Sequence, residues 1–265
     1  MNSALAEPAQ RLAEVLRRHR ALAIAVSGGV DSLTLAAVAQ RAMTVAPLMV
    51  HAVSPAVPPA ATERVRRVAA DLGWSLREIA AGEFSDPNYL ANPYDRCYHC
   101  KSNLYDAMAR ITDRVIASGT NADDLGDYRP GLRAASEREV VHPFVEAGID
   151  KAQIRAMARR LGLEFAELPA QPCLASRVET GVPIRVPDLG FIDDLEGALR
   201  ARLGELAVVR VRMRADGVHV ELGELPPPPV LAELEDSVRG FCSRRGYPFR
   251  AVRPYRQGSA FVKAP

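Results

Sequence analysis

A short apolar run that ends in a double glycine, and then gives way to a helical pattern, limits most strongly how this chain can fold. Residues 21–26 (ALAIAV) have the character of a buried strand, Ser27, Gly28 and Gly29 follow as a turn, and residues 31–43 are rich in Ala and Leu, which favours a helix. A strand that leads through a tight turn into a helix is the first half of a β-α-β unit. Such units build a parallel sheet with helices on both faces.

The alternation of strands and helices continues to about residue 161. The other elements predicted in this region are helices at 4–20, 62–72, 101–111 and 150–161 and strands at 45–53, 75–80 and 114–118. Parallel sheets bind ligands beyond the carboxyl ends of their strands. Two segments follow such ends, 27–32 and 119–127, and we expect them to converge on one crevice.

A change of pattern near residue 188 predicts a second, smaller domain. Its expected elements are a helix at 188–203, strands at 206–213 and 217–222, a helix at 229–245 and a strand at 248–253. This order is typical of a small α+β domain. We therefore predict an α/β fold with a parallel-sheet domain at 1–183 and a small α+β domain at 184–265.

The composition argues against several classes of protein. The 265 residues carry a formal net charge of +2, 48% of them are hydrophobic and 25% are charged, which is ordinary for a globular chain and gives no reason to expect nucleic-acid or membrane affinity. No signal peptide and no membrane span are visible, so we expect a cytoplasmic protein. Four cysteines in such a chain favour metal ligands or catalysts over a disulfide framework.

The hexapeptide SGGVDS at 27–32 has the chemistry of an anion-binding loop. Its glycines let the backbone turn sharply and approach phosphate oxygens, and the helix N-terminus supplies positive potential. Ser27 and Ser32 add hydroxyl donors, and Asp31 would repel a phosphate unless it holds Mg²⁺, which binds carboxylate and phosphate oxygens together. The Walker lysine is absent, which argues against a loop that cradles a transferable γ-phosphate. A glycine-rich structural turn explains a lone Gly-Gly, but not the whole hexapeptide in this setting.

Three cysteines stand in settings that favour metal binding. Cys97 and Cys100 form a C-x-x-C at a predicted helix start, and Cys173 lies between Pro172 and a Ser-Arg pair, which favours the thiolate. Three thiolates can hold three irons of a [4Fe–4S] cluster and leave the fourth iron open for sulfide, or they can bind Zn²⁺ with a fourth ligand. A pair of unrelated buried thiols is the alternative for the C-x-x-C. Cys242, in a predicted amphipathic helix, is interpreted as a core residue.

These motifs together resemble known families. The SGGVDS loop resembles that of the PP-loop ATP pyrophosphatases, and NPYDRCYHCK, GTNADDLGDYRPGLRAASE, PCLASR, RVRMR and RPYRQGS resemble segments of the LarE family. That family comprises ATP-dependent sulfur transferases that help to build the nickel-pincer nucleotide cofactor of lactate racemase. The resemblance implies adenylation of the carboxylates of pyridinium-3,5-biscarboxylic acid mononucleotide, release of AMP and pyrophosphate, and conversion of the carboxylates to thiocarboxylates.

The resemblance leaves more than one source of sulfur. In one mechanistic type the cysteine equivalent to Cys173 gives up its own sulfur, and in the other three cysteines hold a [4Fe–4S] cluster that carries an extra sulfide. Cysteines at all three positions imply the cluster type, with Cys97, Cys100 and Cys173 as metal ligands and catalytic residues. A tRNA thiolase of the same superfamily is an alternative, against which stand the missing second C-x-x-C module and the weak basic character. An ATP-binding regulator without catalysis is opposed by the intact SGGVDS loop.

The resemblance also implies where the ligands bind. ATP and Mg²⁺ are expected at Ser27, Gly28, Gly29, Asp31 and Ser32, with Gly119, Thr120, Asn121 and Asp127 contributing from the second loop. The substrate's phosphate and carboxylates are expected at Arg177, Arg210 and Arg212, with Glu221 orienting an arginine. Arg210, Arg212 and Arg214 alternate and therefore share one strand face, which in most proteins is simply a solvated face. The small domain is expected to bind substrate or to form a homo-oligomer.

Overall fold

The structure, a computed structural model, describes residues 6–126, 129–204, 207–256 and 258–261. The chain forms two compact units, one from Met1–Asp86 and Cys97–Ala170 and the other from Pro87–Arg96 and Gln171–Pro265. The predicted α/β class, a parallel-sheet part followed by a small α+β part, is confirmed. The division differs from the expected boundary between residues 183 and 184, because 87–96 and 171–183 lie in the C-terminal unit.

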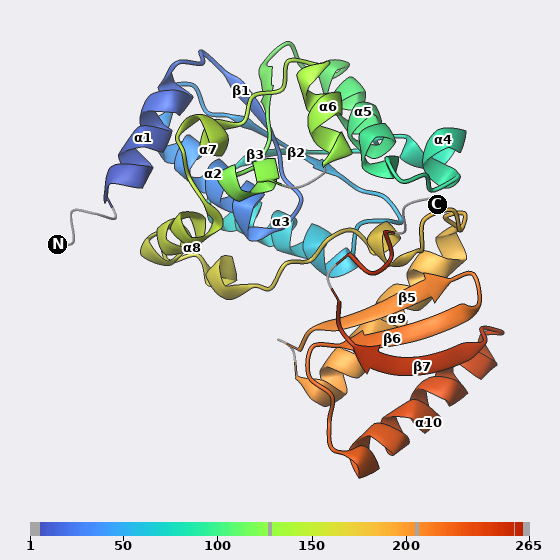
Figure 1. Ribbon diagram of the computed structural model, residues 1–265. Helices are drawn as coiled ribbons and strands as arrows, with labels where there is room; N and C mark the ends of the chain where they lie inside the picture. Colours follow the sequence, from blue (N-terminus) through green and yellow to red (C-terminus); the bar gives the residue numbers. More distant parts are fainter. Residues whose placement is uncertain (1–5, 127–128, 205–206, 257, 262–265) are drawn as a thin grey trace. The chain divides into compact units, whose positions relative to one another are not determined.

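The first unit contains a sheet of parallel strands (Figure 1). The strands are β1 (Leu22–Ala25), β2 (Leu48–Ala52), β3 (Ser75–Ile79) and β4 (Val115–Ala117). Their order is β3-β2-β1-β4, so β1 has β2 on one side and β4 on the other. The chain therefore adds strands first on one side of β1 and then on the other. The carboxyl ends of β1 and β4 mark the point at which such sheets bind ligands.

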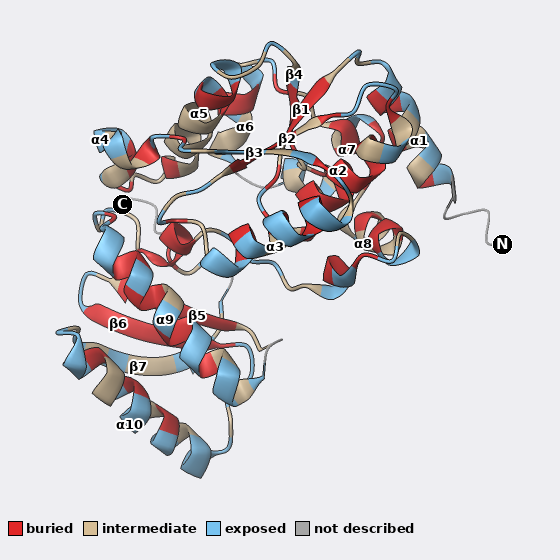
Figure 2. Ribbon diagram, turned by 180° about the vertical axis from the view of Figure 1, so that it is seen from behind, coloured by how far each residue is buried: buried red, intermediate tan, exposed pale blue. Residues whose placement is uncertain are grey.

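Alternate residues of the central strand pack on opposite faces of this sheet. Leu22 and Ile24 belong to the larger core cluster, whereas Ala23 between them belongs to a second cluster. The larger cluster includes residues of α1 (Ala6–Arg17), α2 (Val30–Ala42), α3 (Pro59–Asp71) and α8 (Lys151–Arg160), and the second includes residues of α5 (Arg96–Ala109) and α6 (Pro130–Ser136). Strand side chains point alternately to the two faces, so both faces are buried. Figure 2 shows buried residues along the strands and on α2.

Several short helices fall outside the predicted elements. They are α4 (Pro87–Leu90), α6, α7 (Pro143–Glu146) and the single turns η2 (Glu83–Ser85), η3 (Ala122–Gly126), η4 (Glu164–Glu167) and η5 (Leu174–Arg177). The α-helices among them all begin with proline, which fits a first helical turn because no N–H is needed there. In addition, α5 begins at Arg96 rather than at the predicted residue 101, so the C-x-x-C pair lies within its first five residues.

The predicted ends of α8 are confirmed. Asp150 caps the helix by accepting a hydrogen bond from the backbone N–H of Gln153 at 2.8 Å, and the Gln153 side chain accepts one from the backbone N–H of Asp150 at 3.1 Å. This reciprocal pair satisfies two amides that a helix start leaves without partners. Gly162 has a φ of +68° directly after the helix, which suits a residue without a Cβ.

The second unit has the predicted α-β-β-α-β order. Its elements are α9 (Val186–Leu203), β5 (Val209–Arg214), β6 (Gly217–Leu222), α10 (Pro228–Arg244) and β7 (Phe249–Pro254). Strand β6 pairs antiparallel with β5 and parallel with β7. The two helices contact each other through Phe191 and Phe241, whose ring centroids are 5.7 Å apart. Val209, Val211 and Met213 of β5 are buried, with the arginines on the other face of the strand.

One buried asparagine explains why the stretch before α5 belongs to the second unit. Asn92 has a φ of +53°, and its side-chain amide donates to the carbonyls of Glu179 and Val182, both at 2.8 Å. The side-chain oxygen Oδ1 of Asn92 accepts a hydrogen bond from the Arg96 guanidinium at 2.5 Å. The same Arg96 nitrogen donates to the Ala175 carbonyl at 3.0 Å. These long-range bonds tie the NPYDR segment to the PCLASR segment. No helix in the described part of the chain is long and apolar enough to cross a membrane.

Candidate active site

The SGGVDS loop connects β1 to α2, as predicted. Gly28 has a φ of +82°, and a Cβ at this position would come within 2.7 Å of the Ala61 carbonyl oxygen. Both facts require glycine. Gly29 occupies the N-cap position of α2, so the last residues of the loop form the first turn of that helix. The free amides and the dipole of this turn favour an anion.

The two serines close the loop on itself. The Ser32 hydroxyl accepts a hydrogen bond from the Ser27 amide at 3.0 Å and donates to the Gly29 carbonyl at 3.2 Å. The Ser27 hydroxyl lies 3.2 Å from that of Ser32. The side chains that the sequence assigns to phosphate binding therefore also fix the shape of the loop.

The two predicted loops converge. A Cβ on Gly119, which follows β4, would lie 2.8 Å from the Ser32 amide nitrogen and 2.9 Å from its Cα. Glycine alone permits this approach, so Gly119 brings the second loop onto the first turn of α2. The two loops thus meet at the carboxyl ends of β1 and β4, with Gly119 packed directly against the SGGVDS loop.

A lysine outside the predicted site holds the loop carboxylate. The Lys151 amine lies 2.5 Å from both carboxylate oxygens of Asp31. Burial raises the pKa of Asp31, Lys151 opposes that effect, and the nearby charge of Asp124 adds to it. A neighbouring cation therefore favours the charged form of Asp31. Either Lys151 or a bound Mg²⁺ can supply that cation.

The second loop is ordered by its own carboxylates. The backbone N–H of Asn121 donates to Asp124 at 3.1 Å, and that of Asp123 donates to the Asn121 side chain at 3.0 Å. Asp123 in turn accepts from the backbone N–H of Lys151 at 3.0 Å. These bonds link the loop after β4 to the start of α8. Asp127, predicted to contact the nucleotide, lies outside the described residues.

A hydroxyl chain connects this loop to the segment beside β4. The Ser118 hydroxyl lies 2.8 Å from Nδ1 of His142 and 3.0 Å from the Thr120 hydroxyl. The Ser118 amide donates to the Val141 carbonyl at 3.1 Å, which places the segment containing His142 beside the end of β4. Burial lowers the pKa of His142, which favours the neutral ring.

The cysteines fall into two classes. Cys97 and Cys100 are the second and fifth residues of α5, and Cys173 directly precedes η5. All three are half-buried, which suits thiols that must take up a metal or sulfide. Cys242 is fully buried, and burial raises its pKa to about 11, in agreement with a core residue. Among the described residues, no three His, Cys, Asp or Glu side chains are grouped so that they could hold a metal ion.

Arg177 is engaged in a buried ion pair. Its side chain is 1% exposed and donates to both carboxylate oxygens of Glu196, at 2.9 and 3.0 Å. It also donates to the carbonyls of Pro172 and Cys173, at 2.6 and 3.2 Å. Arg177 therefore holds the backbone around Cys173. The predicted contact between Arg177 and the substrate would require these bonds to open.

Arg210 and Arg212 lie on a buried face of β5 rather than on a solvated one. They are 7% and 4% exposed, and their guanidinium carbons lie 5.9 and 6.0 Å from the centre of the Tyr255 ring. Glu221 orients Arg212 through a 2.9 Å bond, and Arg214 also approaches Glu221, at 3.4 Å. Burial lowers the pKa of Arg210. A buried cationic face of this kind suits a phosphate or a carboxylate.

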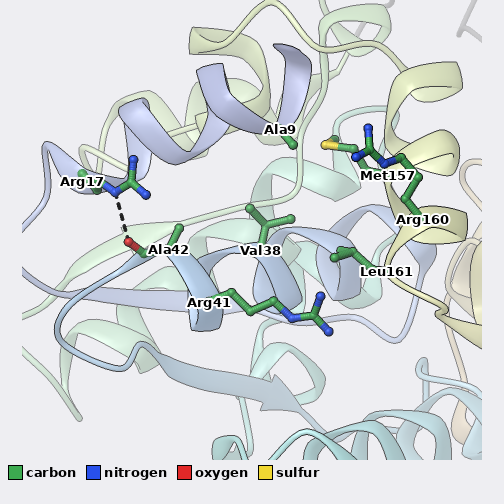
Figure 3. A pocket seen from close by; sticks show the side chains of 8 residues that line it. All are labelled: Ala9, Arg17, Val38, Arg41, Ala42, Met157, Arg160 and Leu161. Atoms are coloured by element: carbon green, nitrogen blue, oxygen red, sulfur yellow. Dashed lines mark hydrogen bonds between the residues drawn. The ribbon is translucent and has the colours of Figure 1, made fainter. Parts of the chain in front are cut away.

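A hollow elsewhere on the first unit does not belong to this site. Figure 3 shows the side chains that line it, which come from α1, the C-terminal part of α2 and the end of α8. Arg17, Arg41 and Arg160 lie at this hollow, and Arg17 donates to the Ala42 carbonyl at 3.3 Å. The SGGVDS loop adjoins the opposite, N-terminal end of α2. The hollow therefore provides no contact with the glycine loop.

No family model matches the chain. A protein of Synechocystis, named "Uncharacterized protein slr1717", is 39% identical over 217 residues, which are 80% of this chain and 79% of that protein. This chain belongs to the same family. A Methanocaldococcus jannaschii relative, "Uncharacterized protein MJ0830", is 27% identical over 239 residues, 89% of each chain. A Lactiplantibacillus plantarum relative, named pyridinium-3,5-bisthiocarboxylic acid mononucleotide synthase, is 30% identical over 166 residues, 61% of this chain and 59% of that protein. The last likeness supports the LarE resemblance.

The sequence did not predict which side chains contact the site residues. Lys151, Glu196 and the pair Ser118–His142 all contact site residues or their neighbours. Lys151 carried a usable signal, since it follows the N-cap of a helix at the predicted binding edge of the sheet. No local pattern marks Glu196, because its role depends on the packing of α9 against β5.

Proposed function

We propose that the chain is an ATP-dependent sulfurtransferase of the LarE family. Its proposed reaction converts the carboxylates of pyridinium-3,5-biscarboxylic acid mononucleotide to thiocarboxylates, for the nickel-pincer nucleotide. The observation that carries the proposal is the SGGVDS loop, with Gly119 packed against it at the carboxyl ends of β1 and β4. The name of the Lactiplantibacillus plantarum relative supports the identity of the product.

The loop suits the activation step. A carboxylate is a poor acceptor of a nucleophile because oxide would have to leave, whereas the adenylate of the same carboxylate can release AMP. Attack of the carboxylate oxygen on the α-phosphate breaks the bond to the β-phosphate, so pyrophosphate departs. In the proposed site the amides of the first turn of α2 bind the pyrophosphate. Asp31 would hold Mg²⁺ and Lys151 would bind a phosphate oxygen, and both cations would stabilise the charge that develops on the departing group.

The three half-buried thiols suit the sulfur step. Cysteine thiols fit the donor set of an iron–sulfur cluster, which Cys97, Cys100 and Cys173 would hold and which would supply the sulfide that replaces AMP. Arg177 fixes the backbone at Cys173 through its bonds to two carbonyls of that segment. The alternative is that Cys173 gives up its own sulfur and ends as dehydroalanine.

The small unit has side chains suited to bind the pyridinium mononucleotide, which accepts the sulfur. The substrate carries a phosphate and two carboxylates, and Arg210 and Arg212 present buried guanidinium groups with Glu221 holding one of them. Bidentate recognition of such anions is characteristic of arginine. We further propose that the enzyme acts in the cytoplasm as a homo-oligomer.

The direct test combines the chain with ATP, Mg²⁺, the pyridinium substrate and a sulfide source under anaerobic conditions. We expect pyrophosphate release that depends on the substrate, and a product in which mass spectrometry detects sulfur in place of oxygen. Asp31→Asn is the matched control and should release no pyrophosphate above background. ATP cleavage without the substrate, or thiolation of tRNA instead, would contradict the proposal.

A second measurement separates the two sources of sulfur. Anaerobic reconstitution followed by iron and sulfide analysis should give a brown, iron-containing protein that turns over repeatedly. A colourless protein that makes a single turnover and loses one sulfur at Cys173, seen in the intact mass, would favour the sacrificial route. Cys242→Ser is the control, because this buried thiol should matter to neither route.

A further inference from the structure

We infer that His142 is a positioning residue which fixes the direction in which the Thr120 hydroxyl donates its proton. The inference rests on the proposed ATP site and concerns groups that the proposed mechanism does not use. Ser118 connects the two residues, 2.8 Å from Nδ1 of His142 and 3.0 Å from the Thr120 hydroxyl. Ser118 is 5% exposed, so water does not substitute freely for either partner.

The chain of hydroxyls has two directions. If Nδ1 of His142 accepts, Ser118 donates to it, Thr120 donates to Ser118, and the Thr120 oxygen presents only lone pairs outward. If Nδ1 of His142 carries its proton and donates, Ser118 accepts from it and donates to Thr120. The Thr120 proton is then free to point outward. In a third arrangement Ser118 would accept from both partners, but its own buried proton would then have no acceptor, so this arrangement is disfavoured.

A nucleotide selects between these directions. Phosphate oxygens only accept hydrogen bonds, so a Thr120 hydroxyl that meets a phosphate must donate, which requires a donating His142. The adjacent Gly119 packs on the first turn of α2, which places Thr120 beside the anion-binding amides of the SGGVDS loop. The proton on Nδ1 of His142 therefore prepares the Thr120 donor before ATP arrives.

The test compares two replacements of similar shape. His142→Asn can place an amide N–H near the position of Nδ1, whereas His142→Asp offers only acceptors at pH 8. Calorimetric titration with ATP and Mg²⁺ should show His142→Asn within about twofold of the unaltered affinity and His142→Asp roughly tenfold weaker, the size of one hydrogen bond to a charged acceptor. Circular dichroism and thermal unfolding check that both variants fold.

Making both His142 replacements in a Thr120→Val background measures the effect of the aspartate charge that does not act through the Thr120 hydroxyl. We expect the gap between the two replacements to shrink to less than about threefold there, because the remaining electrostatic effect is common to both backgrounds. Thr120→Ser, which keeps the hydroxyl, should preserve the full gap. Equal ATP affinities of His142→Asn and His142→Asp, or a gap that persists with Thr120→Val, overturn the role of His142 and leave the proposed function standing. Failure of the unaltered protein to bind ATP overturns both.

Discussion

At the scale of single residues, Lys151 favours the charged form of Asp31 in the proposed site. Burial raises the pKa of Asp31, and the bond to Lys151 is the largest effect that opposes it. Lys151→Met removes that cation, so the carboxyl should keep its proton to higher pH and bind Mg²⁺ more weakly. We expect pyrophosphate release to fall about 100-fold, comparable to the loss of one donor to a transition-state charge. The pH profile should also move to higher pH.

The shift of the profile distinguishes this role from a structural one. Lys151→Arg retains a cation beside Asp31 and should recover the unaltered pH profile, even if its larger head group lowers the rate. Thermal unfolding of both variants checks that the first unit is intact. An unchanged pH profile in Lys151→Met would show that the amine does not set the charge of Asp31.

At the scale of elements, the sequence predicted those parts of the fold whose causes are local. The ends of α8 follow from Asp150 and Gly162, and β1 follows from an apolar run that stops at a double glycine. The convergence of the two loops was predictable, because the carboxyl ends of parallel strands lie at the same edge of a sheet. The partner of Asp31 was not, because Lys151 stands far from it in the chain and the two meet only when α8 packs on α2. Sequence periodicity carries no information about such a contact.

Helix α9 offers a test of a contact that no local pattern reveals. Glu196 accepts from Arg177, from Arg200 at 2.5 Å and from the backbone N–H of Val211 at 3.0 Å. Glu196→Ala leaves a buried guanidinium without its counter-charge, which should destabilise the second unit by about 3–5 kcal/mol. Urea unfolding followed by circular dichroism measures the loss.

The same helix supplies the matched control. Asp194 also forms an ion pair, with Arg245 at 3.0 Å, but both side chains are exposed to solvent. Asp194→Ala should therefore lower the free energy of unfolding by less than about 1 kcal/mol. Similar losses in the two variants would mean that burial does not distinguish these ion pairs.

At the scale of the whole molecule, the path of the chain explains the domain boundary that the sequence did not predict. The chain passes between the units after Asp86, after Arg96 and after Ala170. Prolines stand beside the first and third of these points, but the chain has 20 prolines and these do not single out a boundary. The hydrogen bonds of Asn92 with residues far along the chain join 87–96 to the second unit. A boundary fixed by long-range bonds leaves no mark on composition.

The pH dependence of stability is the prediction that belongs to this scale. His51 donates through Nδ1 to the Val26 carbonyl at 2.8 Å, and its Nε2 lies 2.9 Å from the Thr62 hydroxyl. Burial lowers the pKa of both His51 and His142 below the ordinary 6.5. The unfolded chain therefore binds protons first as the pH falls. Stability should be complete above pH 6.5 and should decrease below it, by at most about 1.4 kcal/mol per histidine and pH unit.

The fluorescence of Trp74 can measure this pH-dependent loss of stability in the first unit. Trp74 is the only tryptophan in the chain and is buried in the first unit, which also contains both histidines, so its fluorescence follows the unfolding of that unit in urea. His51→Gln should be less stable than the unaltered protein at pH 7, because the two bonds of the ring are disturbed. It should nevertheless lose less stability between pH 7 and pH 5.5, because one of the two protonation sites is gone. An equal or steeper loss in His51→Gln would mean that the buried imidazole at this position does not couple folding to pH.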